Sequence, residues 1–293
     1  MKKRGLLLFC AVCAFWMISA APADALDPRD LIAAPAGTKG MIYYYYYYTG
    51  HEMYKTGVKV DENTSSTAHK FALEGLYYGA IGNGIWAVNP AFVFGDMSVN
   101  GTAVGNAEQA ASGMGDPAIA FAYWPLVNRK EKNFIGMSLT TTVPLGQYSN
   151  AKSVNIGSNI WTFKTEAGWI KGWGPFYLQL SGNATFYTDN KEYTTNNLTR
   201  QRDPLYTGEA WLSYDLTPTL YVGGLYSYVN GGESKIKDGA SRNDKTASHI
   251  FGAYIRYKVT PNLSVGLRFK DMVETENGAL LHEMVKVKIT YAW

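Results

Sequence analysis

VKVKITYAW, residues Val285–Trp293, is the stretch of sequence that decides the fold. Successive side chains of a β-strand point to opposite faces, and here one face is apolar while the other is polar or small. An apolar row that ends in an aromatic residue is typical of a transmembrane β-strand, whose outer face meets lipid and whose inner face stays polar. A strand with one buried face in a soluble sheet would alternate in the same way, so the rest of the sequence is needed to distinguish a membrane strand from a soluble one. The apolar row consists of Val285, Val287, Ile289, Tyr291 and Trp293.

The first 25 residues have the layout of a cleaved secretory signal peptide. Met1–Arg4 is basic, Gly5–Ile18 is apolar, and Ser19–Ala25 is rich in small residues. The apolar run is too short and wrongly flanked for a membrane-spanning helix. We therefore expect export across the inner membrane and cleavage after Ala25.

The composition of the expected mature chain excludes several classes of protein. Cys10 and Cys13 are the only cysteines, and both leave with the signal peptide, which excludes disulfides and thiolate metal sites. Loss of three basic residues and one acidic residue from totals of 27 and 24 leaves a charge near zero, with no basic arm for nucleic acid. Because no later stretch has eighteen consecutive apolar residues, such an exported chain can enter a membrane only as a closed β-barrel.

Twelve segments of the mature chain have the length and alternation of membrane-crossing strands. Each is close to the ~9–11 residues that span a bilayer at a tilt, and an even number is usual in bacterial barrels. The sequence therefore predicts an all-β protein, a transmembrane antiparallel up-and-down β-barrel over residues 39–293. A short segment, 26–38, precedes it as a brief helix or a lumen segment. The expected strands are 39–49, 68–80, 85–95, 115–124, 133–143, 159–170, 175–187, 204–215, 219–230, 246–258, 262–273 and 282–293.

The connections between these segments alternate in length. Tight turns such as Gly82–Gly84 and Val259–Pro261 alternate with long polar loops such as 50–67 and 188–203. Residues 274–281 are expected to form the last of the long loops. Outer-membrane barrels have short periplasmic turns and longer extracellular loops, which places both termini in the periplasm. A soluble β-sandwich does not separate its connections by length in this way.

Five phrases, in this order, resemble the phenol-degradation meta-pathway family of outer-membrane proteins. The resemblance spans essentially the whole mature chain. It implies an outer-membrane β-barrel, grouped with hydrophobic-solute channels and often encoded beside aromatic catabolism. It implies no reaction, and there are no family catalytic residues to carry over. The phrases are DPRDLIAAPAGT at 27–38, GMGDPAIAFAYWPL at 113–126, VPLGQYSNAKSVNIGSN at 143–159, FYTDNKEY at 186–193 and YDLTPTLYVGGLYSYVNGG at 214–232.

The last strand carries a second resemblance. Its aromatic end, Tyr291 and Trp293, is similar to the insertion signal by which bacterial outer-membrane barrels are recognised. The expected location is therefore the outer membrane of a Gram-negative bacterium. The expected partners are the lipid of that membrane, the barrel-assembly machinery and a small-molecule solute.

The distribution of histidine argues against an enzyme. A serine hydrolase needs a nucleophile, a base and an orienting group in contact. The histidines of this chain are scattered, and none stands in a His-x-Ser phrase like that of the barrel phospholipases. We therefore expect no catalytic residue, no cofactor and no metal site. The four histidines are His51, His69, His249 and His282.

Ten charged side chains are predicted to point into the barrel. Cations recur on the inner face of the last three strands, where neighbouring strands would gather them into a positive wall, and carboxylates of other strands lie across the lumen. This set either fills and stiffens a narrow barrel as salt bridges or selects solutes, in which case anions such as aromatic acids are favoured. The predicted lumen-lining residues are Arg256, Lys258, Arg268, Lys270, Lys286, Lys288, Glu74, Glu166, Glu209 and Asp215.

Three functions stay open at this point. The leading hypothesis is passive transport or binding of small hydrophobic or aromatic solutes. The second is a structural or surface-interaction barrel whose lumen is plugged by side chains, and the third is an outer-membrane enzyme. An open path through the lumen separates the first from the second. A nucleophile in contact with a base inside the lumen would support the third.

Overall fold

The computed structural model describes residues 26–102, 108–237, 239 and 241–293, so the expected signal peptide, 1–25, lies outside the described residues. Strands and turns make up this part of the chain. Within it, no helix is long and apolar enough to cross a membrane.

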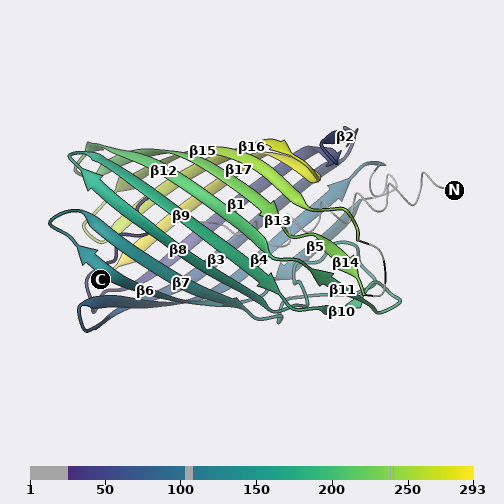
Figure 1. Cartoon of the computed structure of the whole chain (residues 1–293), viewed down its shortest axis with the longest axis horizontal. Coiled ribbons are helices and arrows are strands. Elements are labelled where there is room, and N and C mark those ends of the chain that lie inside the picture. Colours follow the sequence, from purple (N-terminus) through teal and green to yellow (C-terminus); the bar gives the residue numbers. More distant parts are fainter. Residues whose placement is uncertain (1–25, 103–107, 238, 240) are drawn as a thin grey trace.

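Twelve antiparallel strands form a closed barrel, which confirms the predicted fold (Figure 1). Each strand pairs with the next along the chain, and β17 closes the cylinder by pairing with β1, where Met41 lies opposite Tyr291. Closure leaves the wall without a free edge, as a membrane requires. The barrel strands are β1 Lys39–Lys55, β3 Ser65–Ile81, β4 Gly84–Asn100, β6 Ala118–Asn128, β7 Asn133–Thr142, β8 Thr162–Trp173, β9 Phe176–Tyr187, β12 Leu205–Thr217, β13 Leu220–Gly231, β15 Thr246–Lys258, β16 Leu263–Thr275 and β17 Gly278–Ala292.

Shorter strands gather at the end of the barrel opposite the C-terminus, which we call the long-loop end (Figure 1). One of them, β5, pairs with the outer part of β4, while β6 pairs with the rest of β4. Three others form a separate small sheet in the order β10-β11-β14. The bounds of these strands are β2 Val58–Asp61, β5 Gln109–Met114, β10 Asn190–Tyr193, β11 Leu198–Arg202 and β14 Ser234–Ile236.

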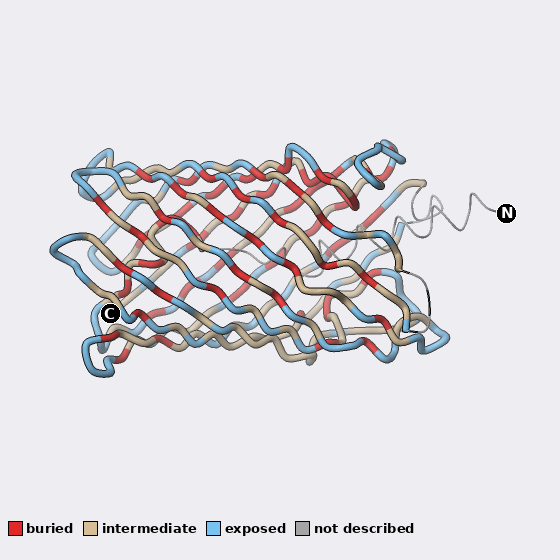
Figure 2. The backbone as a smooth tube through the Cα atoms, viewed as in Figure 1, coloured by how far each residue is buried: buried red, intermediate tan, exposed pale blue. Residues whose placement is uncertain are grey.

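Burial alternates along the strands, as Figure 2 shows. In β16, Leu267 and Phe269 are exposed on the outside, while Arg268 and Lys270 between them are buried. The tyrosine run Tyr43–Tyr48 divides in the same way, with every second ring inside the barrel. An exposed apolar outside around a polar inside is the arrangement that lipid requires.

The expectation of a long loop at 274–281 was wrong. Strand β16 ends at Thr275 and β17 begins at Gly278, so only two residues connect them. The side chain of Asn277 stabilises this turn, since it accepts a hydrogen bond from the backbone N–H of Thr56 at 2.9 Å and donates one to the carbonyl of Lys245 at 2.8 Å. The apolar residues that follow the turn are buried strand residues.

An apolar cluster fills the lumen at the long-loop end. The connection between β7 and β8 contributes Val154 and Ile156, which are buried among inward side chains of several strands. Asp116 holds this connection, because its carboxylate accepts hydrogen bonds from the backbone N–H groups of Gly146 and Ser158 at 2.8 and 2.7 Å. We call the cluster the mouth cluster; it includes Tyr48, Met53, Met97, Val99, Val154, Ile156, Val229, Ile250, Met272, Leu281 and Met284.

Candidate functional site: the barrel lumen

Residues 26–34 lie inside the barrel, folded into short turns, and residues 35–37 after them are exposed. The first turn of the segment is closed by two hydrogen bonds, from the N–H of Asp30 to the carbonyl of Asp27 and from the N–H of Ile32 to the carbonyl of Arg29. Side chains of the wall donate to four backbone carbonyls of the segment, those of Leu26, Asp27, Pro28 and Leu31, at 2.9–3.1 Å. The segment is therefore bound to the wall through its backbone. The four donors are Trp211, Gln179, Tyr221 and Trp124.

The carboxylate of Asp27 lies at the centre of the positive wall. Its Oδ1 atom is 2.9 Å from Nη1 of Arg268 and 2.7 Å from Nζ of Lys286, and its Oδ2 atom is 3.3 Å from Nζ of Lys288. Lys288 also contacts Asp30 at 2.9 Å. Burial alone would raise the pKa of the Asp27 carboxyl, but the charges of Lys286, Lys288 and Arg268 hold that pKa well below its usual range. Asp27 is therefore an ionised group that forms ion pairs with three cations of the wall.

Arg29 attaches the same segment to the opposite side of the lumen. Its Nη1 atom is 2.5 Å from Oδ1 of Asp215, and its Nε atom donates to Oγ of Ser213 at 3.0 Å. The guanidinium lies over two aromatic rings, 4.1 Å from the centroid of Tyr177 and 4.0 Å from that of Tyr221. Arg29 thus combines an ion pair with two cation–π contacts.

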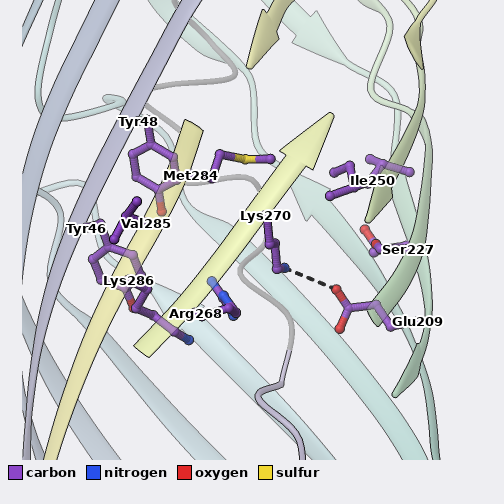
Figure 3. A pocket seen from close by; sticks show the side chains of 12 residues that line it. Tyr46, Tyr48, Glu209, Ser227, Ile250, Arg268, Lys270, Met284, Val285 and Lys286 are labelled. Carbon is purple, nitrogen blue, oxygen red and sulfur yellow. Dashed lines mark hydrogen bonds and ion pairs between the residues drawn. The ribbon is translucent and has the colours of Figure 1, made fainter. Parts of the chain in front are cut away.

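Inward side chains of β1, β12, β16 and β17 surround a small pocket between the N-terminal segment and the mouth cluster. Here Lys270 of β16 points toward Glu209 of β12, with 3.4 Å between Nζ and Oε1 (Figure 3). Tyr46 and Tyr48 of β1 line the same pocket, whose volume is about 20 Å³, roughly enough for one water molecule. We call this place the constriction.

The remaining predicted lumen residues have separate surroundings. Arg256 donates to Oγ of Ser264 at 3.1 and 2.7 Å. Glu166 is 3.4 Å from Lys164, its neighbour on β8. Lys258 is exposed at the short-turn end and lines a cavity of about 350 Å³ with Arg29, Asp215 and Arg256. The ten residues therefore lie in several small groups, and we call the cavity at Lys258 the rim cavity.

A second cavity of about 320 Å³ lies inside the barrel beside the N-terminal segment, and we call it the lumen cavity. Its volume is at the lower end of the range for small-molecule sites, about 300–1,000 Å³. Alanines of β4 and β6 form one wall, and aromatic rings and charged groups form the others. Tyr78 and Trp124 lie with their ring centroids 5.6 Å apart. The cavity lining includes Leu26, Asp30 and Leu31 of the segment; Tyr44, Tyr46, Tyr78 and Trp124; Ala91, Ala118, Ala120 and Ala122; and Glu74, Asn89, Lys164, Glu166, Lys286 and Lys288.

The N-terminal segment supplies ion-pair partners for the charged lumen residues that were not predicted from the sequence. Asp27, Arg29 and Asp30 belong to no strand, so the alternation that assigned the inward residues could not include them. A signal was nevertheless present, because the predicted inward set contains six cations and four carboxylates. Buried charges need partners, and the charged phrase DPRD at the start of the mature chain was the nearest unassigned source of carboxylates.

Comparisons with known proteins agree with this architecture. The family model described as “Putative MetA-pathway of phenol degradation” matches residues 46–284. The chain is similar in structure to the COG4313 outer membrane channel from Pseudomonas putida F1, with 22% sequence identity, a TM-score of 0.87, and coverage of 92% of this chain and 100% of that chain. It is also similar to the transport unit of the autotransporter AIDA-I from Escherichia coli, with 10% identity, a TM-score of 0.56 and coverage of 97% and 98%. A third similar structure is the beta domain of the Bordetella autotransporter Brka, with 6% identity, a TM-score of 0.54 and coverage of 88% and 100%. These likenesses show the fold of an outer-membrane β-barrel, and none of the three is described as an enzyme. No curated protein matches the chain.

Proposed function

Because the chain belongs to the family described as “Putative MetA-pathway of phenol degradation”, we propose that it passes small hydrophobic or aromatic solutes by passive diffusion. The family description names a pathway and no solute, so the support for an aromatic solute comes from the lumen. The observation that carries it is the lumen cavity, whose alanine and aromatic walls suit a flat apolar molecule. Cavities that hold small ligands are mostly apolar with a few placed polar groups.

The mouth cluster supports an apolar solute. Met53, Met97, Met272 and Met284 all belong to it, and methionine side chains adapt readily to irregular apolar partners. A solute that entered at the long-loop end would cross this cluster and the constriction before it reached the lumen cavity. The rim cavity lies beyond the N-terminal segment, at the short-turn end.

Uptake by liposomes tests the proposal directly. We expect the purified barrel in liposomes to take up neutral aromatics such as toluene faster than protein-free liposomes do. Ala120→Phe, which fills the lumen cavity, should slow that uptake severalfold. Phe121→Ala, the next residue on the lipid-facing side of β6, should leave the rate unchanged and serves as the matched control. Uptake no faster than in protein-free liposomes, or a folded Ala120→Phe barrel with the wild-type rate, would contradict passive passage.

A plugged, structural barrel is the second candidate. The constriction of about 20 Å³ and the bound N-terminal segment favour it. This candidate predicts neither solute flux nor single-channel conductance from the folded barrel, so the same liposome preparations decide between the two functions.

We further propose that the barrel resides in the outer membrane with both termini in the periplasm, as the separation of short turns from long connections favours. Single cysteines in the cysteine-free mature chain test this orientation. Asn196→Cys, in the exposed turn between β10 and β11, should react with an impermeant thiol reagent on whole cells. Asn83→Cys, in the exposed turn between β3 and β4, should react only after the outer membrane is opened. The reverse labelling pattern would invert the orientation.

A further inference from the structure

Two polar side chains that line the lumen cavity lack a side-chain partner among the residues that the structure describes. Glu74 of β3 and Asn89 of β4 both line the cavity, and neither forms a hydrogen bond or an ion pair with any residue that the structure describes. Asn89 lies two residues before Ala91, which is the cross-strand partner of Glu74. The two side chains are therefore diagonal neighbours on one face of the sheet, roughly 7–8 Å apart at their backbones. One small group can lie between them and contact both.

The charge of the lumen cavity favours an uncharged occupant. Its lining contains three lysines and three carboxylates, and the cations already contact carboxylates. Lys286 and Lys288 contact Asp27, and Lys164 contacts Glu166. An anion would meet Glu74 as a like charge, and a cation would meet the nearby lysines. A neutral group that donates and accepts hydrogen bonds suits both Glu74 and Asn89.

We propose that Glu74 and Asn89 select aromatic solutes that carry a hydroxyl group. The hydroxyl donates a hydrogen bond to the carboxyl of Glu74 and accepts one from Nδ2 of Asn89. The ring lies along Ala91 and Ala120, within reach of Tyr78 and Trp124. Glu74 acts as a specificity-determining residue, because its carboxyl loses water on entry of an apolar ring and regains a partner only from a hydroxyl.

This inference rests on the proposed passage of aromatic solutes, so its test measures equilibrium binding as well as flux. Phenol and toluene form a matched pair, since they differ only by a hydroxyl in place of a methyl group. We expect Glu74→Leu to reduce the preference for phenol over toluene about threefold to tenfold, the factor that one hydrogen bond of ordinary net strength supplies. Leu73→Ala changes the residue next to Glu74 on the lipid-facing side of β3, outside the cavity, and should leave the preference unchanged. Calorimetry on the full-length barrel gives binding, and liposome uptake gives flux.

Each outcome separates the inference from the proposed function. Toluene and phenol flux through a folded Glu74→Leu barrel with an unchanged phenol preference overturns the inference and leaves the function standing. Phenol-selective binding without flux overturns the function and supports the inference. A wild-type barrel that prefers benzylamine to phenol, with the preference lost in Glu74→Leu, would make Glu74 a cation site and overturn the hydroxyl assignment. A wild-type preference for benzoate over phenol would also overturn the hydroxyl assignment.

Discussion

Asp27→Ala is expected to lower the free energy of unfolding of the barrel by about 3–5 kcal/mol, the usual effect of removing one partner of a buried ion pair. Asp27 is 1% exposed and contacts Arg268, Lys286 and Lys288. Without it, three buried cations repel one another around an empty position. The N-terminal segment should also leave the lumen, because Asp27 supplies its central contact with β16 and β17.

Two measurements check this expectation. Urea titration of the purified barrel, followed by tryptophan fluorescence, gives the change in stability, and planar-bilayer recording should show a larger conductance as the lumen opens. Asp30→Asn is the matched control, because among the described residues Asp30 forms an ion pair with Lys288 alone, whereas Asp27 pairs with three cations, and Asp30 is partly exposed. It should have a clearly smaller effect. A loss of stability no greater than that of Asp30→Asn would mean that Asp27 is not the main partner of the wall.

Trp293→Asp is expected to reduce the amount of barrel in the outer membrane severalfold without changing its synthesis. Trp293 is exposed at the short-turn end, where its ring centroid is 5.5 Å from that of Tyr291, and its backbone pairs with Lys39 to complete the closure between β17 and β1. We propose that the barrel-assembly machinery recognises this aromatic pair.

Loss of stability and loss of recognition by the assembly machinery would have different effects in this variant. A charge near the membrane interface costs only about 0–1 kcal/mol, so the Trp293→Asp barrel refolded in detergent should be almost as stable as the wild type. The cellular amount should nevertheless fall, as judged by immunoblot of outer-membrane fractions and by heat-modifiable mobility. Trp161→Asp, at another exposed tryptophan, is the control and should insert normally. Wild-type amounts of the Trp293→Asp barrel in the membrane would exclude the terminal aromatic as a recognition signal.

Alternation along single strands was sufficient to predict most of the barrel. In β16, for example, every second residue from Leu263 to Phe269 is apolar, and that pattern depends only on neighbours in the sequence. The turn at Asn277 could not be derived in this way. The residues before it are charged, and the apolar Ala279–Leu281 after it is too short a run to reveal that β17 had already begun.

The candidate site depended on contacts that no local pattern contains. Asp27 and Lys286 are 259 positions apart, and only the path of a segment outside the strands brings them together. The predicted inward direction of Lys286 and Lys288 did not reveal that carboxylates of the N-terminal segment would pair with them. This pairing leaves less positive charge in the lumen to favour anions. For the same reason, changing both lysines to glutamate would act first on the binding of the N-terminal segment, because the new carboxylates would face Asp27 and Asp30.

The run Tyr43–Tyr48 has a consequence for how β1 tolerates deletions. Six identical residues cannot specify the register of this part of β1 by themselves, so the pairing with the neighbours β3 and β17 sets it. Loss of two tyrosines would keep every later side chain of β1 on its own face, whereas loss of one would exchange the lipid-facing and lumen-facing sets. The strand should therefore tolerate deletion of two tyrosines better than deletion of one.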